Sequence, residues 1–174
     1  MHFRAKTLAL TLALSLAAVL GAASLPREAI DLTFTTHNGQ KVSLSSLKGK
    51  VVAVIFYSTD CPHCQKTADL LAPMYSELKA KGGEIVALAV NPSAAANIKT
   101  FVSDHNVAFP TGLGTNQQWF AFAQIPFGQN AYVPHMLFVD KTGTVVEDHP
   151  GGDRKFWLQQ ETSIRASFDR LLAK

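Results

Sequence analysis

Charged residues and cysteines are both scarce in this sequence. Only 17% of the 174 residues are charged and only two are cysteine, whereas 47% are hydrophobic. This composition excludes a disordered or fibrous chain. The sequence also lacks internal repeats, low-complexity tracts and long polar linkers, which indicates one domain, and its length is sufficient for a hydrophobic core.

An excess of charge of one sign is lacking as well. The formal net charge is +3, and Arg4 and Lys6 near the N-terminus supply two of those three charges. The rest of the chain carries too little positive charge to indicate a nucleic acid or an anionic membrane as its partner. We therefore expect the substrate to be a protein or a small molecule.

The N-terminal segment, residues 1–24, has the pattern of an export signal. A basic start is followed by an apolar run from Leu8 to Leu20 and then by small residues, so we expect cleavage after Ala23 or Ser24. The alternative is an uncleaved membrane anchor, because the uncharged stretch approaches the length that spans a bilayer. Both interpretations place the domain formed by residues 26–174 outside the cytoplasm, in the periplasm or secreted, either free or anchored to the inner membrane.

The two cysteines, Cys61 and Cys64, are separated by only two residues. A disulfide between them closes a very small loop, which stabilises a fold far less than a long-range bridge does. In a compartment where disulfides persist, this spacing favours redox chemistry over a structural bridge.

Hydrophobic periodicity predicts strands that alternate with helices. Apolar runs predict strands over residues 30–34, 41–44, 51–57, 84–90, 136–140 and 144–147. Helical periodicity predicts helices from the cysteine motif to residue 81 and over 92–105, 115–124 and 154–172. This order indicates an α/β sandwich in which helices flank a central mixed sheet, with the first two strands forming an N-terminal β-hairpin.

The motif Cys61-Pro62-His63-Cys64 lies where a buried strand is followed by a helix. A helix N-terminus stabilises an anion, so we expect Cys61 to be the exposed thiolate nucleophile. Cys64 lies one helical turn later and is expected to be the buried thiol that resolves the mixed disulfide. Pro62 suits the first helical turn, and a protonated His63 further stabilises the Cys61 thiolate.

Asp60 acts in the opposite direction to His63. Its negative charge directly precedes Cys61 and disfavours the thiolate. These residues therefore leave the direction of electron flow open. The polar run from Ser58 to Asp60 is also expected to cap the helix.

Three further stretches carry a resemblance to a known family. They are the Asn-Gly turn at Asn38, the sequence LSSLKGK from Leu44 to Lys50, and the segment from Val133 to Gly143. Together with the Cys-Pro-His-Cys motif, they resemble the extracytoplasmic thioredoxin-like group that includes the TlpA and ResA proteins and is related to the AhpC/TSA family. The resemblance implies a thioredoxin-like fold, thiol–disulfide exchange with partner proteins, and a membrane or periplasmic redox partner.

By this resemblance Pro134 is the family's cis-proline beside the cysteines, and Val133 offers backbone hydrogen bonds to an extended substrate. Two positions depart from the family pattern: Asp60 replaces an aromatic residue, and Ile55 replaces a buried carboxylate that accepts the proton of the resolving thiol. His135 is also unusual. It either faces the cysteines, where it could bind a substrate, a proton or a metal, or is a solvated residue at a strand edge.

Two alternatives to a disulfide reductant remain. The Pro-His dipeptide resembles that of periplasmic disulfide-introducing oxidants, whereas the more extensive scaffold resemblance slightly favours a reductant. A different class of function is a copper-delivery module in which Cys61, Cys64 and His135 bind Cu(I). No flavin, nicotinamide or haem motif is present, so we expect no bound cofactor, and disulfide exchange itself needs no metal site.

Overall fold

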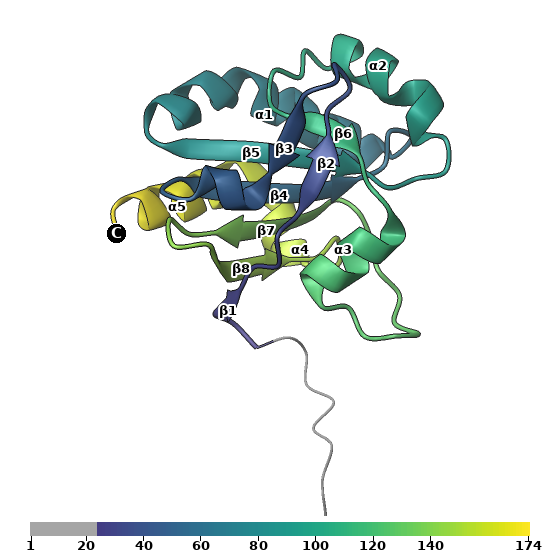
Figure 1. The fold of residues 1–174 in the computed structure, drawn as a ribbon. Coiled ribbons are helices and arrows are strands. Elements are labelled where there is room, and N and C mark those ends of the chain that lie inside the picture. The colour runs from purple at the N-terminus through teal and green to yellow at the C-terminus, as the bar shows by residue number, and fades with distance from the viewer. Residues whose placement is uncertain (1–23) are drawn as a thin grey trace, which may run out of the picture.

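A six-stranded mixed β-sheet forms the centre of the molecule in the computed structural model, which describes residues 24–174 (Figure 1). The strand order is β1-β8-β7-β4-β5-β6, and β2 and β3 form a separate hairpin. The strands are β1 (Arg27–Glu28), β2 (Thr33–Thr35), β3 (Lys41–Ser43), β4 (Val51–Tyr57), β5 (Gly83–Ala89), β6 (Thr111–Leu113), β7 (His135–Val139) and β8 (Thr144–His149). The predicted mixed sheet and N-terminal hairpin are thus confirmed. The predicted signal segment lies outside the described residues, except for Ser24.

The central parallel strands are β4 and β5, and every residue in them is buried. β4 has the sequence VVAVIFY, a continuous run of β-branched, small and aromatic residues that suits a strand covered on both faces. Its pairing with β5 runs in register from Val51 opposite Gly83 to Tyr57 opposite Ala89. Because both strands run in the same direction, their carboxyl ends lie at the same edge of the sheet.

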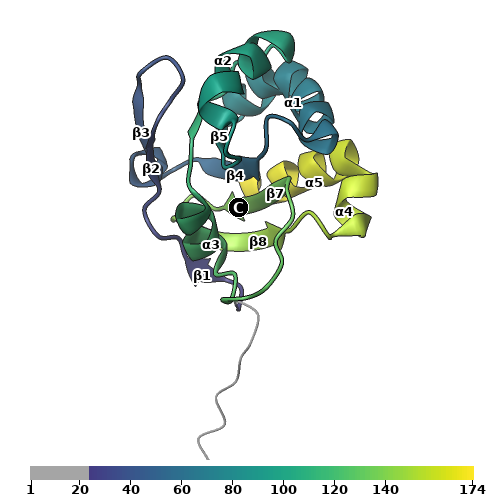
Figure 2. The same cartoon turned by 90° about the vertical axis from the view of Figure 1, so that its right-hand side faces the viewer.

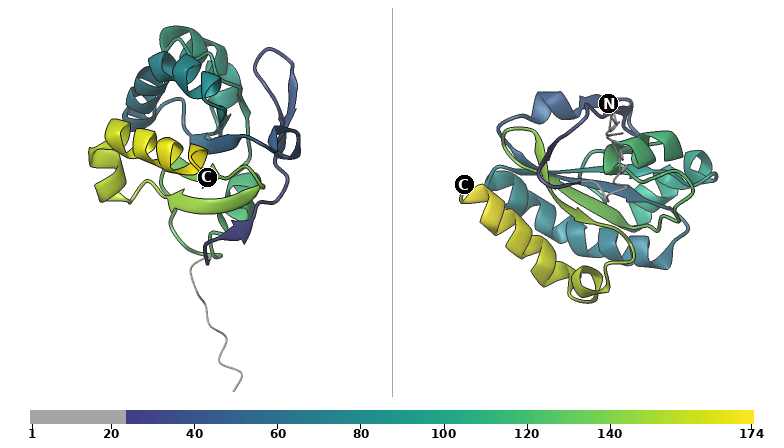
Figure 3. Two further views of the ribbon diagram at one scale, coloured as in Figure 1. Left: turned by 90° about the vertical axis from the view of Figure 1, so that its left-hand side faces the viewer. Right: turned by 90° about the horizontal axis from the view of Figure 1, so that it is seen from below.

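Helices cover both faces of the sheet, so a hydrophobic core lies on each side (Figures 2 and 3). They are α1 (Pro62–Ala80), α2 (Ala94–Asp104), α3 (Asn116–Ala123), α4 (Arg154–Leu158) and α5 (Gln160–Leu172), with a 3₁₀ helix at Leu44–Leu47. One core is formed with α1, α2, α4 and α5, and the other with α3 and the β2–β3 hairpin. Figure 3 shows α1 and α5 side by side on one face. Within residues 24–174, no helix combines the length and the apolar composition needed to cross a membrane.

Two short strands and one helix interruption differ from the prediction. β1 has two residues and pairs with β8, while β6 has three residues and pairs with β5. Strands this short show no recognisable alternation of apolar and polar residues. The single helix predicted over 154–172 is interrupted at Gln159, whose backbone angles (φ −123°, ψ 41°) are not helical.

The β2–β3 hairpin is held against the edge of the sheet at β6. Thr36 forms an isolated β-bridge with Gly112, and the side chain of Phe34 is buried there. A Cβ atom on Gly112 would clash with the carbonyl oxygen of Thr35 and lie 2.7 Å from the Phe34 ring. The close approach of the hairpin therefore requires glycine at this position.

We expect Gly112→Ala to lower the free energy of unfolding by about 1–3 kcal/mol, because the added methyl group overpacks the contact with the hairpin. Urea denaturation would measure the change. Gly152→Ala is the matched control, since a Cβ there meets no atom within 4 Å. Equal stability of the two variants would contradict the role of Gly112.

Candidate active site at the start of helix α1

The two cysteines lie where β4 gives way to α1. β4 ends at Tyr57 and α1 begins at Pro62, so Cys61 occupies the N-cap position. Pro62 is the first helical residue, where the missing N–H costs no intrahelical hydrogen bond. The predicted cap by Ser58 to Asp60 is wrong, because the N-cap residue is Cys61 and no side chain caps the helix. The unpaired N–H groups of the first turn are thereby left facing the Cys61 end of the motif.

Cys61 and Cys64 are not joined by a disulfide bond, and their surroundings differ. Cys61 is half-buried, and its Sγ lies 4.0 Å from the carbonyl oxygen of Val133. Cys64 is 2% exposed, and its Sγ accepts a hydrogen bond from the Ser58 amide at 3.5 Å. Burial raises the pKa of the Cys64 thiol. This arrangement leaves Cys61 accessible to a partner and keeps Cys64 behind it.

The predicted cis-proline segment lies beside the cysteines. The peptide bond between Val133 and Pro134 is cis. Pro134 lines a small cavity together with Cys64, and Val133 packs against the same core as both cysteines. The structure therefore brings Cys61, Cys64, Val133 and Pro134 together, as the sequence predicted.

No carboxylate or imidazole lines the cavity beside the resolving thiol. The cavity has a volume of about 20 Å³ and a mostly apolar wall that includes Ile55 and Tyr57. Ile55 is 3% exposed and fills the position where the family pattern has an acid. Among the described residues, the wall of this cavity therefore offers Cys64 no carboxylate to accept its proton.

The carboxylate of Asp60 is bound by a cluster of neutral donors around the start of α2. Its carboxylate accepts hydrogen bonds from Ser93, from Asn97 at 2.8 Å and from Asn91 at 3.0 Å. The hydrogen bonds from Ser93 and then Asn97 lower the pKa of Asp60. Asp60 is thus kept ionised without a cation to neutralise it, directly before Cys61.

Asn91 also fastens the loop that carries Cys61. Its Oδ1 accepts from the Thr59 amide at 3.1 Å, and its Nδ2 donates to the Thr59 hydroxyl at 2.9 Å. Gln65 Nε2 donates to the Thr59 carbonyl oxygen at 3.0 Å from the other side. Our sequence reasoning missed Asn91, although its place directly after the strand that pairs with β4 is a signal that could have revealed it.

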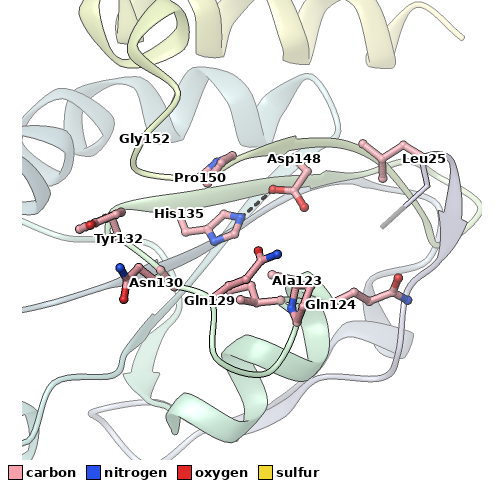
Figure 4. Close-up of a pocket in the computed structure, with 13 residues that line it drawn as sticks. Leu25, Ala123, Gln124, Gln129, Asn130, Tyr132, His135, Asp148, Pro150 and Gly152 are labelled. Carbon is pink, nitrogen blue, oxygen red and sulfur yellow. Dashed lines mark hydrogen bonds and ion pairs between the residues drawn. The ribbon is translucent and has the colours of Figure 1, made fainter. Parts of the chain in front are cut away.

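His135 faces away from the cysteines. Side chains alternate along β7, so Met136 packs in the core that contains Cys64, whereas Leu137 packs in the opposite core with Trp119. The His135 ring is 3% exposed; its Nδ1 accepts from Trp119 Nε1 at 2.9 Å, and its Nε2 lies 2.6 Å from Asp148 Oδ1. Figure 4 shows His135 and Asp148 together in the wall of a pocket of about 520 Å³.

Both expectations for His135 were therefore wrong. The residue neither faces Cys61 and Cys64 nor is solvated at a strand edge. An indole N–H can only donate, so Nδ1 of His135 carries no proton and Nε2–H donates to Asp148. The copper alternative loses its third ligand, and within residues 24–174 no group of three His, Cys, Asp or Glu side chains is arranged to hold a metal ion.

The chain is similar to proteins that are named for thiol–disulfide chemistry. It is 32% identical over 133 residues to the thiol-disulfide oxidoreductase ResA of Bacillus thuringiensis (strain Al Hakam), with 76% of this chain and 73% of that protein covered. It is 40% identical over 81 residues to ResA of Bacillus subtilis (strain 168), with 47% and 45% covered. A thioredoxin family thiol:disulfide interchange protein from Chlorobium tepidum TLS shares the fold, with a TM-score of 0.69, 24% identity, and 84% of this chain and 99% of that one covered.

The fold, the dithiol at the start of α1 and these relatives define a thioredoxin-like thiol–disulfide oxidoreductase of the ResA type. The model of the AhpC/TSA family matches residues 26–148, and the chain belongs to that family.

We expect His135→Leu to lower the free energy of unfolding by about 1–3 kcal/mol, because it leaves the buried Trp119 N–H without an acceptor. The rate at which Cys61 reacts with a thiol reagent should not change, because His135 lies on the other face of the sheet. Urea denaturation and reagent kinetics would test the two statements. His63→Leu is the stability control, since this exposed histidine should alter the unfolding free energy by no more than about 0.5 kcal/mol.

Proposed function

We propose that this protein is a reductant that acts outside the cytoplasm on disulfides of partner proteins. The observation that carries the proposal is the contrast between the two thiols. Cys61 is half-buried beside the carbonyl group of Val133, whereas Cys64 is buried behind Cys61. A nucleophile must reach a partner disulfide, whereas a resolving thiol must reach only the nucleophile. The positions of Cys61 and Cys64 meet these two requirements.

The reaction takes place in two exchange steps. The Cys61 thiolate attacks one sulfur of a partner disulfide, a mixed disulfide forms, and the first partner thiol leaves. The Cys64 thiol loses its proton to water and attacks the sulfur of Cys61, which releases the second partner thiol. Two electrons pass to the partner, and the protein is left with a Cys61–Cys64 disulfide that an external reductant must reopen.

The residues around Cys61 have supporting roles in this proposal. Pro62 begins α1 and so places Cys61 at the helix N-terminus, where the thiolate is favoured. His63 is exposed and, when protonated, adds positive charge beside the thiolate. Val133 offers its backbone and Pro134 its ring to an extended segment of the partner.

Charges near Cys61 bear on the direction in which electrons flow between this protein and its partner. A stabilised Cys61 thiolate is a good leaving group and belongs to a disulfide donor, so His63 favours oxidation of the partner. The ionised Asp60 has the opposite effect. Its negative charge disfavours the Cys61 thiolate and thereby favours the disulfide form of the pair, as in a reductant. The resemblance of the scaffold to the TlpA and ResA group favours a reductant, and the Pro-His dipeptide supports the alternative of a disulfide-introducing oxidase or isomerase.

The location outside the cytoplasm rests on the N-terminal export pattern. A secreted Mycobacterium tuberculosis disulfide oxidoreductase has a similar fold, with a TM-score of 0.60 and 21% identity, and 78% of this chain and 95% of that one covered. A reductant in such a compartment needs a source of electrons, so we expect a membrane or periplasmic redox partner that returns the pair to the dithiol form.

Replacing each cysteine separately should separate their roles. We expect Cys61→Ser to abolish reduction of a model protein disulfide, because the remaining thiol of Cys64 is buried and cannot reach the partner. Cys64→Ser should form a mixed disulfide through Cys61 and then stop, because nothing releases the partner. Mass spectrometry under non-reducing conditions would detect the trapped complex, and full exchange activity of Cys61→Ser would refute the assignment.

Asp60→Asn should make the reduction potential of the cysteine pair less negative, because it removes a charge that opposes the Cys61 thiolate. Equilibration against glutathione or dithiothreitol at defined ratios would measure the potential. Asp169→Asn is the control, since this exposed carboxylate on α5 lies near Lys81, which ends α1 far from the cysteines, and should leave the potential unchanged. For the unaltered protein we expect a value near the thioredoxin end of the scale, about −270 mV, and a value near the strongly oxidising end, about −120 mV, would reverse the proposed direction.

A further inference from the structure

A groove runs alongside the cysteine motif and has a volume of about 310 Å³. One wall comes from the first turns of α1 with His63 and Lys66, and the opposite wall comes from α4 with Arg154, Trp157 and Leu158. The Val133–Pro134 segment forms the end of the groove that lies nearest the Cys61 sulfur. A partner chain that presents a disulfide to Cys61 must therefore pass along this groove or beside it.

The charged side chains of the groove are all positive or can become positive. Lys66 and Arg154 are exposed and lie on opposite walls, and no carboxylate is among the lining residues. Within the described part of the chain, neither residue forms an ion pair with an acidic group. Their charges are therefore available to a ligand.

Asp153, which directly precedes Arg154 in the sequence, interacts with groups other than Arg154. The carboxylate of Asp153 accepts a hydrogen bond from the Phe156 amide at 3.2 Å and pairs with His149 Nδ1 at 2.9 Å. The charged side chains that line the groove itself are thus Lys66 and Arg154, with His63 when it is protonated.

An exposed apolar surface adjoins these cations. Leu158 is 76% exposed, although it belongs to a helix and is a large aliphatic residue. The Trp157 ring is partly buried, and its Nε1 donates to the Pro150 carbonyl oxygen at 2.8 Å, which fixes its orientation. Apolar surface flanked by free cations suits a ligand that carries both carboxylates and an apolar side chain.

We propose that this groove selects partner proteins whose reactive disulfide is flanked by an acidic segment with an apolar residue. This deepens the proposed function, because it names the class of substrate for the same cysteine pair. The carboxylates bind Lys66 and Arg154, the apolar side chain packs on Leu158 and Trp157, and the partner backbone is brought to Val133.

Synthetic peptides with an internal disulfide would test the selection. One peptide carries Glu residues on both sides of the disulfide and a second carries Lys at the same positions, while both keep one leucine. We expect the reduced protein to react with the Glu peptide roughly tenfold faster at low salt, and the difference to shrink as salt screens the charges. The double variant Lys66→Gln with Arg154→Gln should bring the two rates together.

The control is Lys41→Gln with Lys99→Gln, which removes the same total charge at exposed positions outside the groove. It should retain the preference of the unaltered protein. Equal rates for the two peptides with the unaltered protein would overturn the substrate class while leaving the oxidoreductase intact. A preference that survives the Lys66 and Arg154 changes would also overturn it, and failure of both peptides to react at all would instead refute disulfide reduction itself.

Discussion

Strands β4 and β5 pair along their full length, and the chemistry of the site depends on where that pairing ends. The loop after β4 carries Thr59, Asp60 and Cys61, and the loop after β5 carries Asn91. Because the strands are parallel, the two loops meet at one edge of the sheet, and the Asn91 side chain reaches both Thr59 and Asp60. Hydrophobic burial of two continuous apolar strands therefore positions polar groups that themselves lie outside the core.

The alternation of side chains along β7 keeps a second polar network apart from the thiols. Met136 lies on the face of the sheet covered by α1, and His135 lies on the face covered by α3. A register shift of one residue would exchange these two faces and bring the imidazole to the side of Cys64. The alternation along β7 thus leaves Cys64 in apolar surroundings, where burial raises the pKa of its thiol, and leaves His135 between an indole and a carboxylate.

The features that could be predicted from sequence depend on local patterns. The continuous run of β4 and the cysteine spacing each lie within a few residues, so the strand and the motif were predictable from them, whereas the cis-proline at Pro134 was expected only from the family resemblance. The partners of His135 are 16 and 13 residues away, and Asn91 is 32 residues from Thr59. The pairing of strands and the packing of α3 on the sheet bring these residues together. Asp60 was expected to act locally as a cap, but its carboxylate found donors on another helix instead.

Asp60 and the cations of the groove act on the Cys61 thiolate in opposite directions. Asp60 is held by neutral donors, which keep it ionised and leave its full negative charge beside Cys61. Lys66 and Arg154 attract carboxylates of the partner to the other side of the motif. An acidic segment bound there screens the groove cations and adds negative charge near the thiolate, which makes the thiolate less stable and its attack on a disulfide more favourable. Under the proposed selection, binding of an acidic segment therefore makes the Cys61–Cys64 pair a stronger reductant, and this effect opposes the stabilisation that the same carboxylates give to the partner's own disulfide.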